Sequence, residues 1–176
     1  MKPQRILVAG SGGQGVVFLG RLIATAAMSG TPHVTFFPSY GAEVRGGACH
    51  CQVILSPGEI PSPVAREFDV LLLMNQASVD RYLARLAPGG TAILNSTLCH
   101  PPPGTPHVTV PATERAEQLG DARTANLVLL GALLACHPIL PPEQVEQSLR
   151  SLLTGAQPNV VELNLAAFRA GLSVEV

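Results

Sequence analysis

Apolar residues follow two different patterns in the first part of the chain. Residues 6–9 form a short continuous apolar run, whereas residues 16–27 carry apolar side chains three or four positions apart. The first pattern is typical of a strand that is buried on both faces, and the second is typical of a helix. Gly30 followed by Pro32 predicts the end of that helix. The chain therefore begins with the first half of a βαβ unit.

The same two patterns continue to the end of the chain. Apolar runs predict further strands at residues 33–37, 48–55, 69–74, 91–95 and 108–110. Helical spacing and helix-start signals predict helices at residues 77–86, 125–136 and 159–170, and others that begin at residues 113 and 141. Glycine and proline predict a turn at residues 88–90 and loops at residues 38–47, 56–63 and 96–106.

Strands that alternate with helices in this way predict an α/β fold. The expected architecture is a three-layer, Rossmann-like sandwich in which a mostly parallel sheet carries helices on both faces. The sequence contains no internal repeat and no linker of the kind that separates domains. We therefore expect residues 1–176 to form a single domain.

A glycine-rich turn separates the first strand from the first helix, and its spacing fits the pattern G-x-G-x-x-G. Glycine permits positive φ angles and close approach, so such a turn can present bare N–H groups at the positive end of the helix, where phosphates and carboxylates bind. Alternatively, the glycines only allow the helix and the strand to pack closely. The candidate ligand-binding residues of this turn are Gly10, Gly12, Gly13, Gln14 and Gly15.

A dinucleotide site would also require an acidic residue at the end of the second strand, where it would bind the ribose hydroxyls. Residues 33–37 lead instead into Pro38 and Ser39, and Glu43 comes only after a further turn. The sequence therefore disfavours NAD or FAD as the ligand.

The segment at residues 38–47 is a second candidate for ligand binding. It follows the second strand as the glycine turn follows the first, and sites in open α/β sheets gather at that edge. Arg45 could hold a phosphate or carboxylate, or it could pair with Glu43 and fix the loop. Residues 43–45 could also form a short helical turn. The candidates in this segment are Ser39, Tyr40, Glu43, Arg45, Gly46 and Gly47.

The composition is unusually apolar. Charged residues make up 13% of the chain, against about 25% in a typical protein, and apolar residues make up 47%. No apolar run reaches the ~18 residues that span a bilayer, and the N-terminus does not resemble a signal peptide. We therefore expect a cytoplasmic protein without membrane contact, whose surplus apolar surface is covered by other subunits or whose core is large. A net charge of −1 without a basic patch argues against nucleic acid.

Four cysteines are expected to be reduced thiols: Cys49, Cys51, Cys99 and Cys136. Cys49 and Cys51 should share one strand face, with the histidine between them on the other. The C-x-x-C spacing of zinc sites is absent. A metal site built from Cys49, Cys51, Cys99 and His100 is the alternative to buried thiols, and we favour the thiols. The sequence also has no G-x-S-x-G, H-E-x-x-H, P-loop or kinase motif. We therefore expect no metal and no catalytic residue in this chain.

Taken together, the motifs resemble those of the gamma subunit of 2-oxoacid:ferredoxin oxidoreductases. The S-Y-G-x-E-x-R-G-G segment is the most specific of them, and the likeness extends over nearly the whole chain. Two tripeptides depart from the family pattern, since residues 42–44 read Ala-Glu-Val in place of Pro-Glu-Met and residues 49–51 read Cys-His-Cys in place of Ala-Asn-Cys. Besides the two loops, the likeness rests on residues 74–76, 88–90, 95–96, 126, 130–133 and 162–164.

The resemblance implies a pyruvate/ketoisovalerate oxidoreductase gamma-type domain in a complex that oxidatively decarboxylates a 2-oxo acid, forms an acyl-coenzyme A and passes electrons to ferredoxin. Thiamine diphosphate and Mg would be held by the alpha and beta subunits, and iron–sulfur clusters by the beta or a delta subunit. This chain would hold no cofactor itself and would be inactive alone. Its two glycine-bearing loops would be the candidates for contact with coenzyme A, and 2-oxoglutarate is the favoured substrate over pyruvate, branched-chain and aryl 2-oxo acids.

Three other interpretations stay open. The chain could be a stand-alone Rossmann-like nucleotide-binding protein, although the missing ribose acid argues against it. It could also be a beta-type subunit of indolepyruvate oxidoreductase, which is often longer, or a purely architectural subunit that binds no ligand. An apolar partner face could also produce a homodimer when the natural partners are absent.

Overall fold

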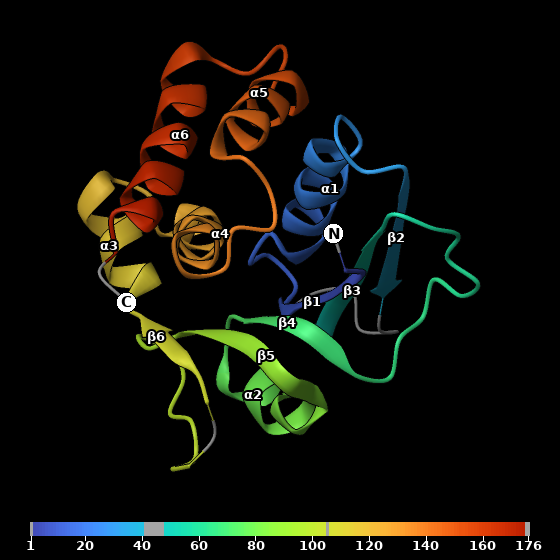
Figure 1. Cartoon of the computed structure of the whole chain (residues 1–176). Coiled ribbons are helices and arrows are strands. Elements are labelled where there is room, and N and C mark those ends of the chain that lie inside the picture. The colour runs from blue at the N-terminus through green and yellow to red at the C-terminus, as the bar shows by residue number, and fades with distance from the viewer. Residues whose placement is uncertain (1, 41–47, 105, 175–176) are drawn as a thin grey trace.

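The computed structural model describes residues 2–40, 48–104 and 106–174, and for Tyr40 the backbone only. A twisted sheet with strand order β2-β3-β1-β4-β5-β6 forms its centre (Figure 1). The strands are β1 (Gln4–Ser11), β2 (His33–Tyr40), β3 (Ala48–Ser56), β4 (Phe68–Leu73), β5 (Leu86–Asn95) and β6 (Val108–Val110). The α-helices are α1 (Val16–Ala27), α2 (Gln76–Tyr82), α3 (Ala112–Leu119), α4 (Ala125–Cys136), α5 (Pro142–Leu152) and α6 (Pro158–Leu172), with short 3₁₀ turns at η1 (Leu83–Arg85) and η2 (Ala122–Thr124).

The sheet is parallel except at one strand. β1, β4, β5 and β6 pair in parallel, whereas β3 runs antiparallel between β1 and β2. Ser11 at the end of β1 pairs with Ala48, and Tyr40 at the end of β2 pairs with Cys49. The carboxyl ends of β1 and β2 therefore meet at one edge of the sheet, as expected from the sequence.

The two faces of the sheet are covered unequally. Figure 1 shows α1 and α4 over one face, with α5 and α6 stacked beyond them, and α2 against the other face. The larger core lies on the side of α1 and α4 and includes Leu19, Val128 and Phe168, while the smaller core lies under α2 and includes Phe68. The predicted α/β class with helices on both faces is confirmed.

Helix α4 is apolar on all sides, and its position in the fold explains why. The sheet covers one side of α4, and α6 crosses its other side. Gly131 makes this crossing close, because a Cβ atom there would overlap the carbonyl oxygen of Phe168 and lie 2.8 Å from the Cα atom of Gly171. The boundaries predicted for this helix agree with the structure.

Strand β2 is longer than the sequence pattern predicts. It continues from His33 through Pro38 to Tyr40, whereas a loop was expected from Pro38 onward. Pro38 pairs with Cys51 of β3. Proline is tolerated there because β2 is an edge strand, so one side of its backbone has no neighbouring strand to bond.

The predicted start of β5 was also wrong. Helical conformation ends close to the predicted position, because α2 ends at Tyr82 and the 3₁₀ turn η1 continues to Arg85, but the strand begins at Leu86 rather than at residue 91. The expected turn at residues 88–90 lies inside β5 as an irregularity, where Gly89 has φ +75° and the register against β4 shifts. The apolar pattern could not show this start, because Leu83 and Leu86 are three positions apart, which is helical spacing, although Leu86 belongs to the strand.

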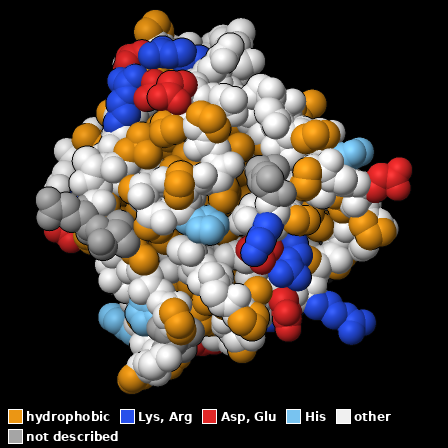
Figure 2. All heavy atoms as spheres, viewed as in Figure 1, with side chains coloured by type: hydrophobic (Ala, Val, Ile, Leu, Met, Phe, Trp, Pro, Cys, Tyr) orange, Lys and Arg blue, Asp and Glu red, His pale blue; other side chains and the backbone are white. Residues whose placement is uncertain are grey.

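The surface is only lightly charged. Figure 2 shows hydrophobic side chains over much of the face seen in Figure 1, while basic and acidic side chains gather in two places, one over α6 and one to the right of the centre. In the described part of the chain, no helix is both long and apolar enough to cross a membrane. The most exposed large hydrophobic side chains come from different elements, namely Met28, Phe37, Val64, Leu98, Leu119 and Val160.

Candidate functional site

The glycine turn joins β1 to α1, and its glycines have different surroundings. A Cβ atom at Gly10 would lie 2.7 Å from the side-chain oxygen of Gln14, and one at Gly15 would overlap the Asn126 amide nitrogen. These two glycines therefore permit close packing. Gly12 and Gly13 are exposed, and a Cβ atom at Gly13 would meet nothing within 4 Å. The middle of the turn is therefore open, whereas its two ends are closely packed.

The Gln14 side chain holds the turn in shape from the inside. Its Oε1 atom accepts the backbone N–H of Ser11 at 2.7 Å, and its Nε2 atom donates to the carbonyl of Met74 at 3.4 Å. Asn75 adds to this network by donating to the Ser11 hydroxyl at 2.6 Å and to Gln14 Oε1 at 3.2 Å. The network ties the end of β1 to the end of β4. Asn75 also accepts the N–H of Ser78 at 2.9 Å and so begins α2.

The first turn of α1 finds no side-chain acceptor for its N–H groups among the described residues. Gly15 is the N-cap residue with φ 73°, and as a glycine it has no side chain to cap the helix, whose first turn contains no acidic residue. The N-terminus of a helix carries a partial positive charge and unsatisfied N–H groups. This end of α1 is therefore electrostatically suited to an anion.

A crevice of about 240 Å³ opens beside the glycine turn, at the carboxyl ends of β1, β4 and β5. Within the sheet, β2 and β3 lie on one side of β1, and β4, β5 and β6 lie on its other side. The direction in which strands are added therefore reverses beside β1. Ligands of open α/β sheets bind at such switch points. The residues that line this switch-point crevice are Gly13, Gln14, Met74, Asn95, Leu98, Thr113, Ala122, Arg123, Ala125, Asn126 and Leu129.

Two buried asparagines organise the walls of the crevice. Asn95 accepts the N–H groups of Ala112 and Thr113 at 3.1 and 3.3 Å, so it caps α3 from the end of β5. Asn126 donates to the carbonyl of Gly15 at 3.3 Å and so joins α4 to the glycine turn. Both side chains fix the positions of helix ends around the crevice.

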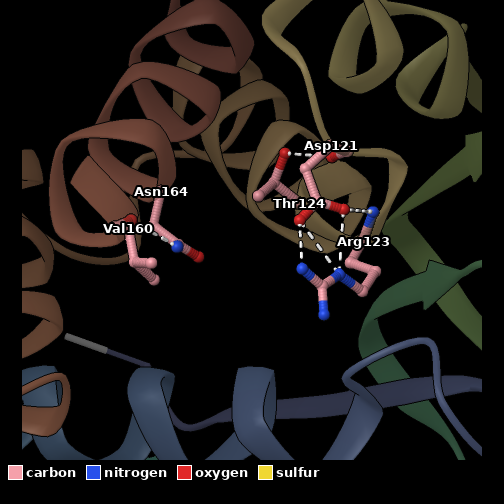
Figure 3. A network of polar contacts seen from close by, with 5 residues as sticks. All are labelled: Asp121, Arg123, Thr124, Val160 and Asn164. Carbon is pink, nitrogen blue, oxygen red and sulfur yellow. Dashed lines mark hydrogen bonds and ion pairs between the residues drawn. The ribbon is translucent and has the colours of Figure 1, made fainter. Parts of the chain in front are cut away.

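Arg123 contributes a charge at the rim of the crevice. Its Nη2 atom lies 2.6 Å from Asp121 Oδ2, and its Nε atom lies 2.9 Å from the same oxygen. This guanidinium lowers the pKa of the Asp121 carboxyl by hydrogen bonding. Figure 3 shows the Arg123 guanidinium lying against the Asp121 carboxylate, with its third nitrogen pointing away from that carboxylate.

The structure brings only some of the sequence candidates together. Gly13 and Gln14 line the switch-point crevice, whereas Ser39 and the backbone of Tyr40 lie in β2, two strands away from β1. The remaining candidates of the second loop lie outside the described residues, namely Glu43, Arg45, Gly46 and Gly47. The short helical turn expected at residues 43–45 lies outside them as well.

Several residues of the crevice were not selected from the sequence as site residues. Asn95 and Asn126 had weak signals, because each is a polar residue at the edge of an apolar strand or helix. Arg123 and Thr113 had none. Residues 13 and 126 are more than a hundred positions apart, and local patterns do not show that they are neighbours.

Two cysteines are buried on opposite faces of the sheet. Burial raises the pKa of Cys51 to about 12 and that of Cys99 to about 11. Cys51 packs toward α1, whereas Cys99 belongs to the core under α2. The alternative metal site that combines them is therefore wrong. Among the described residues, no group of three or more histidine, cysteine, aspartate or glutamate side chains could hold a metal ion.

The sheet face under α2 carries the histidine expected there. The His50 ring lies opposite the Cys51 side chain, and its Nδ1 atom is 3.1 Å from the hydroxyl of Tyr82 in α2. Burial, with the nearby charges of Arg81 and Arg85, lowers the pKa of His50. This pair joins β3 to α2 and does not line the crevice.

The stretch at residues 162–164 makes contacts that stabilise the C-terminal helices. Glu162 accepts a hydrogen bond from Arg150 of α5 at 3.0 Å, and Asn164 donates to the carbonyl of Val160 at 2.7 Å (Figure 3). Both contacts connect residues within α5 and α6. Neither residue lines the switch-point crevice.

Comparison with known proteins assigns the chain to a family. Residues 5–174 match the family model described as pyruvate ferredoxin/flavodoxin oxidoreductase. The ketoisovalerate oxidoreductase subunit VorA of Methanothermobacter thermautotrophicus is 36% identical over 95% of this chain and 35% of its own length. This chain therefore spans about a third of that relative.

Shorter relatives match along nearly their whole length. The 2-oxoglutarate synthase subunit KorC of Archaeoglobus fulgidus is 33% identical, and the match covers 96% of this chain and 86% of the relative. The indolepyruvate oxidoreductase subunit IorB of the same organism is 29% identical over 94% of this chain and 92% of its own length.

Two solved structures are similar in fold. The gamma subunit of a keto/oxoacid ferredoxin oxidoreductase from Geobacter sulfurreducens has a TM-score of 0.82 and 32% identity over 97% of this chain and 95% of its own. The 2-oxoglutarate:ferredoxin oxidoreductase of Magnetococcus marinus, solved with 2-oxoglutarate, coenzyme A and succinyl-CoA bound, has a TM-score of 0.88 and 25% identity over 98% of this chain and 31% of its own. The resemblance seen in the sequence is therefore confirmed, and the chain belongs to the pyruvate ferredoxin/flavodoxin oxidoreductase family as a gamma-type subunit.

Proposed function

We propose that this chain serves a complex that oxidatively decarboxylates a 2-oxo acid, transfers the acyl group to coenzyme A and passes the electrons to ferredoxin. The observation that carries the proposal is the likeness to a complete gamma subunit, which covers 97% of this chain and 95% of that subunit. In this proposal, alpha and beta partner subunits hold thiamine diphosphate and Mg, and a beta or delta subunit holds the iron–sulfur clusters.

The proposed substrate is 2-oxoglutarate. Support comes from the 2-oxoglutarate synthase subunit that this chain matches over most of both lengths. Ketoisovalerate is the second candidate, because the ketoisovalerate subunit has the higher identity of 36%. The values of kcat/KM for 2-oxoglutarate, ketoisovalerate, pyruvate and indolepyruvate in the assembled complex distinguish them. We expect 2-oxoglutarate to give the highest value, and a higher value for another acid contradicts this choice.

The proposed role of this chain is contact with coenzyme A through its two glycine-bearing loops. The exposed Gly13, the uncapped start of α1 and the adjoining crevice support this role, because together they offer N–H groups to a phosphate. Arg45, in the second loop, is proposed to supply a cation. An architectural subunit without any ligand contact is the alternative.

A charge placed in the glycine turn separates these two roles. Gly13→Asp adds a carboxylate where a phosphate is proposed to bind, so the KM for coenzyme A in the complex should rise about tenfold or more. Gly155→Asp is the matched control, because both glycines have positive φ angles, 96° and 89°, and open space around the Cβ position. Equal KM values for the two variants would favour the architectural role.

Arg45→Ala tests the second loop. It should also raise the KM for coenzyme A, and unchanged kinetics would remove Arg45 from the proposed site.

A stand-alone nucleotide-binding protein is the remaining rival. It would bind nucleotide as an isolated chain, which calorimetric titration with NAD or ATP measures directly. We expect no binding of either nucleotide in the micromolar range. A micromolar dissociation constant would favour the rival.

A further inference from the structure

Arg123 has a distinct place among the side chains around the switch-point crevice. It is the one charged side chain among the described residues that line this crevice. The floor is formed mainly by apolar side chains such as Met74 and Leu129, and the walls carry uncharged amides. The guanidinium pairs with Asp121 beside the crevice, and the other lining residues are uncharged. This arrangement favours a ligand that places a negatively charged group at the rim and an uncharged remainder in the crevice.

The contacts of Arg123 with the described residues leave three of its five guanidinium N–H groups open. The guanidinium uses its Nε and Nη2 atoms to bind Asp121, at 2.9 and 2.6 Å. Nη1 has no hydrogen-bond partner within the residues that the structure describes, and the side chain is 84% exposed. The edge formed by Nη1 and Nη2 is therefore available, and a guanidinium edge binds two oxygens of a phosphate side by side.

Asp121 is suited to hold the guanidinium in this orientation. It accepts the backbone N–H of Arg123 at 2.9 Å, and its backbone carbonyl accepts the hydroxyl of Thr124 at 2.8 Å (Figure 3). These contacts keep the carboxylate at the start of η2, just before α4. Binding to Arg123 through one edge thus orients the other edge and restricts the motion of an otherwise flexible side chain.

We propose that Arg123 is a specificity-determining residue that binds a phosphate group of coenzyme A at the rim of the switch-point crevice. This inference rests on the proposed function and names a cation for it that the sequence motifs do not include. The proposal differs from the assignment to Arg45, because Arg123 belongs to the turn that precedes α4 rather than to the loop after β2.

The test compares two arginines in the assembled complex. Arg123→Gln removes the proposed contact, and Arg150→Gln is the matched control, because Arg150 is also an exposed, ion-paired arginine but lies on α5 and pairs with Glu162 at 3.0 Å. We expect Arg123→Gln to raise the KM for coenzyme A about tenfold or more, with kcat and the KM for the 2-oxo acid unchanged. Arg123→Lys keeps the charge but not the bidentate geometry, so its KM for coenzyme A should lie between those of the wild type and Arg123→Gln. Equal KM values for the two glutamine variants overturn the proposal.

Acyl acceptors with fewer phosphates separate a direct contact from a structural effect. Dephospho-coenzyme A lacks the 3′-phosphate, and pantetheine lacks every phosphate. A KM effect of Arg123→Gln that disappears with dephospho-coenzyme A supports contact with the 3′-phosphate, and one that persists supports contact with the pyrophosphate. An equal effect with pantetheine overturns the proposal, because the substitution would then act without any phosphate.

A binding measurement separates this proposal from the proposed function. Adenosine 3′,5′-bisphosphate carries the nucleotide phosphates without the thiol and can be titrated into the same complexes by calorimetry. If no 2-oxo acid supports coenzyme A-dependent turnover, the proposed function fails, but this titration still tests Arg123. We expect binding to be about tenfold weaker with Arg123→Gln than with Arg150→Gln, and equal binding contradicts the inference.

Discussion

Asp69 provides the clearest polar contribution of a single residue to the fold. It accepts the backbone N–H of Arg5 and two guanidinium hydrogen bonds, at 2.9, 2.9 and 3.0 Å, and so ties the start of β1 to β4. Burial alone would raise the pKa of this carboxyl, but the hydrogen bonds and charge of Arg5 outweigh it, and the pKa is lowered. Charge-assisted, bidentate contacts of this kind are stronger than single exposed ion pairs.

The first prediction concerns this carboxyl. Asp69→Asn should lower the free energy of unfolding at pH 7 by about 1–2 kcal/mol, because it weakens a charged, partly buried contact. The control Glu162→Gln breaks an exposed pair and should cost at most about 0.5 kcal/mol. Urea unfolding of the wild type and of both variants measures these values.

The pH dependence follows from the direction of the pKa shift. A carboxyl whose folded pKa is depressed stabilises the fold above its unfolded pKa and loses that contribution as the pH falls through the folded value. The difference between the wild type and Asp69→Asn should therefore be constant from pH 7 to about pH 5 and narrow below about pH 4. A difference that grows in acid would contradict the account.

A second prediction concerns the thiols. With a pKa of about 12 and no exposed surface, Cys51 should react with iodoacetamide at pH 8 at least about a hundredfold more slowly than a free thiol. Cys99 should be similarly slow, while the half-buried Cys49 and Cys136 should be labelled first. Mass spectrometry of the native protein gives the order, and early labelling of Cys51 would show that the sheet opens there.

At the scale of the elements, the crossing of α4 and α6 depends on two glycines. Gly131→Ala should destabilise the protein by about 2 kcal/mol or more, because the added Cβ atom overlaps the backbone of α6. Helix propensity alone predicts the opposite sign, since alanine is favoured over glycine inside helices by about 1 kcal/mol. The control Gly58→Ala lies in open space, and its effect should stay within about 0.5 kcal/mol.

Thermal or urea unfolding of Gly131→Ala and Gly58→Ala decides between packing and propensity. A neutral or stabilised Gly131→Ala would mean that the two helices can move apart at little cost. The close crossing would then not be a fixed feature of the fold.

The apolar patterns predicted most of these elements, because the buried strands give continuous apolar runs and most helices give apolar side chains three or four positions apart. The helix at residues 125–136 was predicted at its observed boundaries, since the long apolar stretch at residues 127–136 fits a helix between a sheet and another helix. The direction of β3 was not predictable, because a buried strand has the same side-chain pattern in either direction. The early start of β5 was missed because a glycine with φ +75° allows a strand to continue through an apparent turn.

The candidate site was predicted only in part, for a different reason. The glycine turn is a local motif, and its place beside the switch point follows from the chain order. The other walls of the crevice come from Asn95, Arg123 and Asn126, which join the turn only through tertiary packing. No spacing rule connects residues that lie on β5, η2 and α4.

At the scale of the whole molecule, the uneven coverage of the sheet suits a subunit of a complex. Among the described residues, α1, α3, α4, α5 and α6 all lie on one side of the sheet. The other face is covered mainly by α2 and by the proline-rich connection at residues 56–63. Several large hydrophobic side chains are exposed, among them Phe37 of β2 and Val64. Burial of such side chains against other chains is the expected use of this surface.

The central proposal is that this gamma-type chain works only as part of a complex with the proposed partner subunits. The most direct test measures ferredoxin reduction with 2-oxoglutarate and coenzyme A, using the alpha and beta subunits with this chain, the same subunits without it, and this chain alone. The account predicts full turnover only with all components and none with the chain alone. Turnover by the isolated chain, or full activity of the partners without it, would contradict the account.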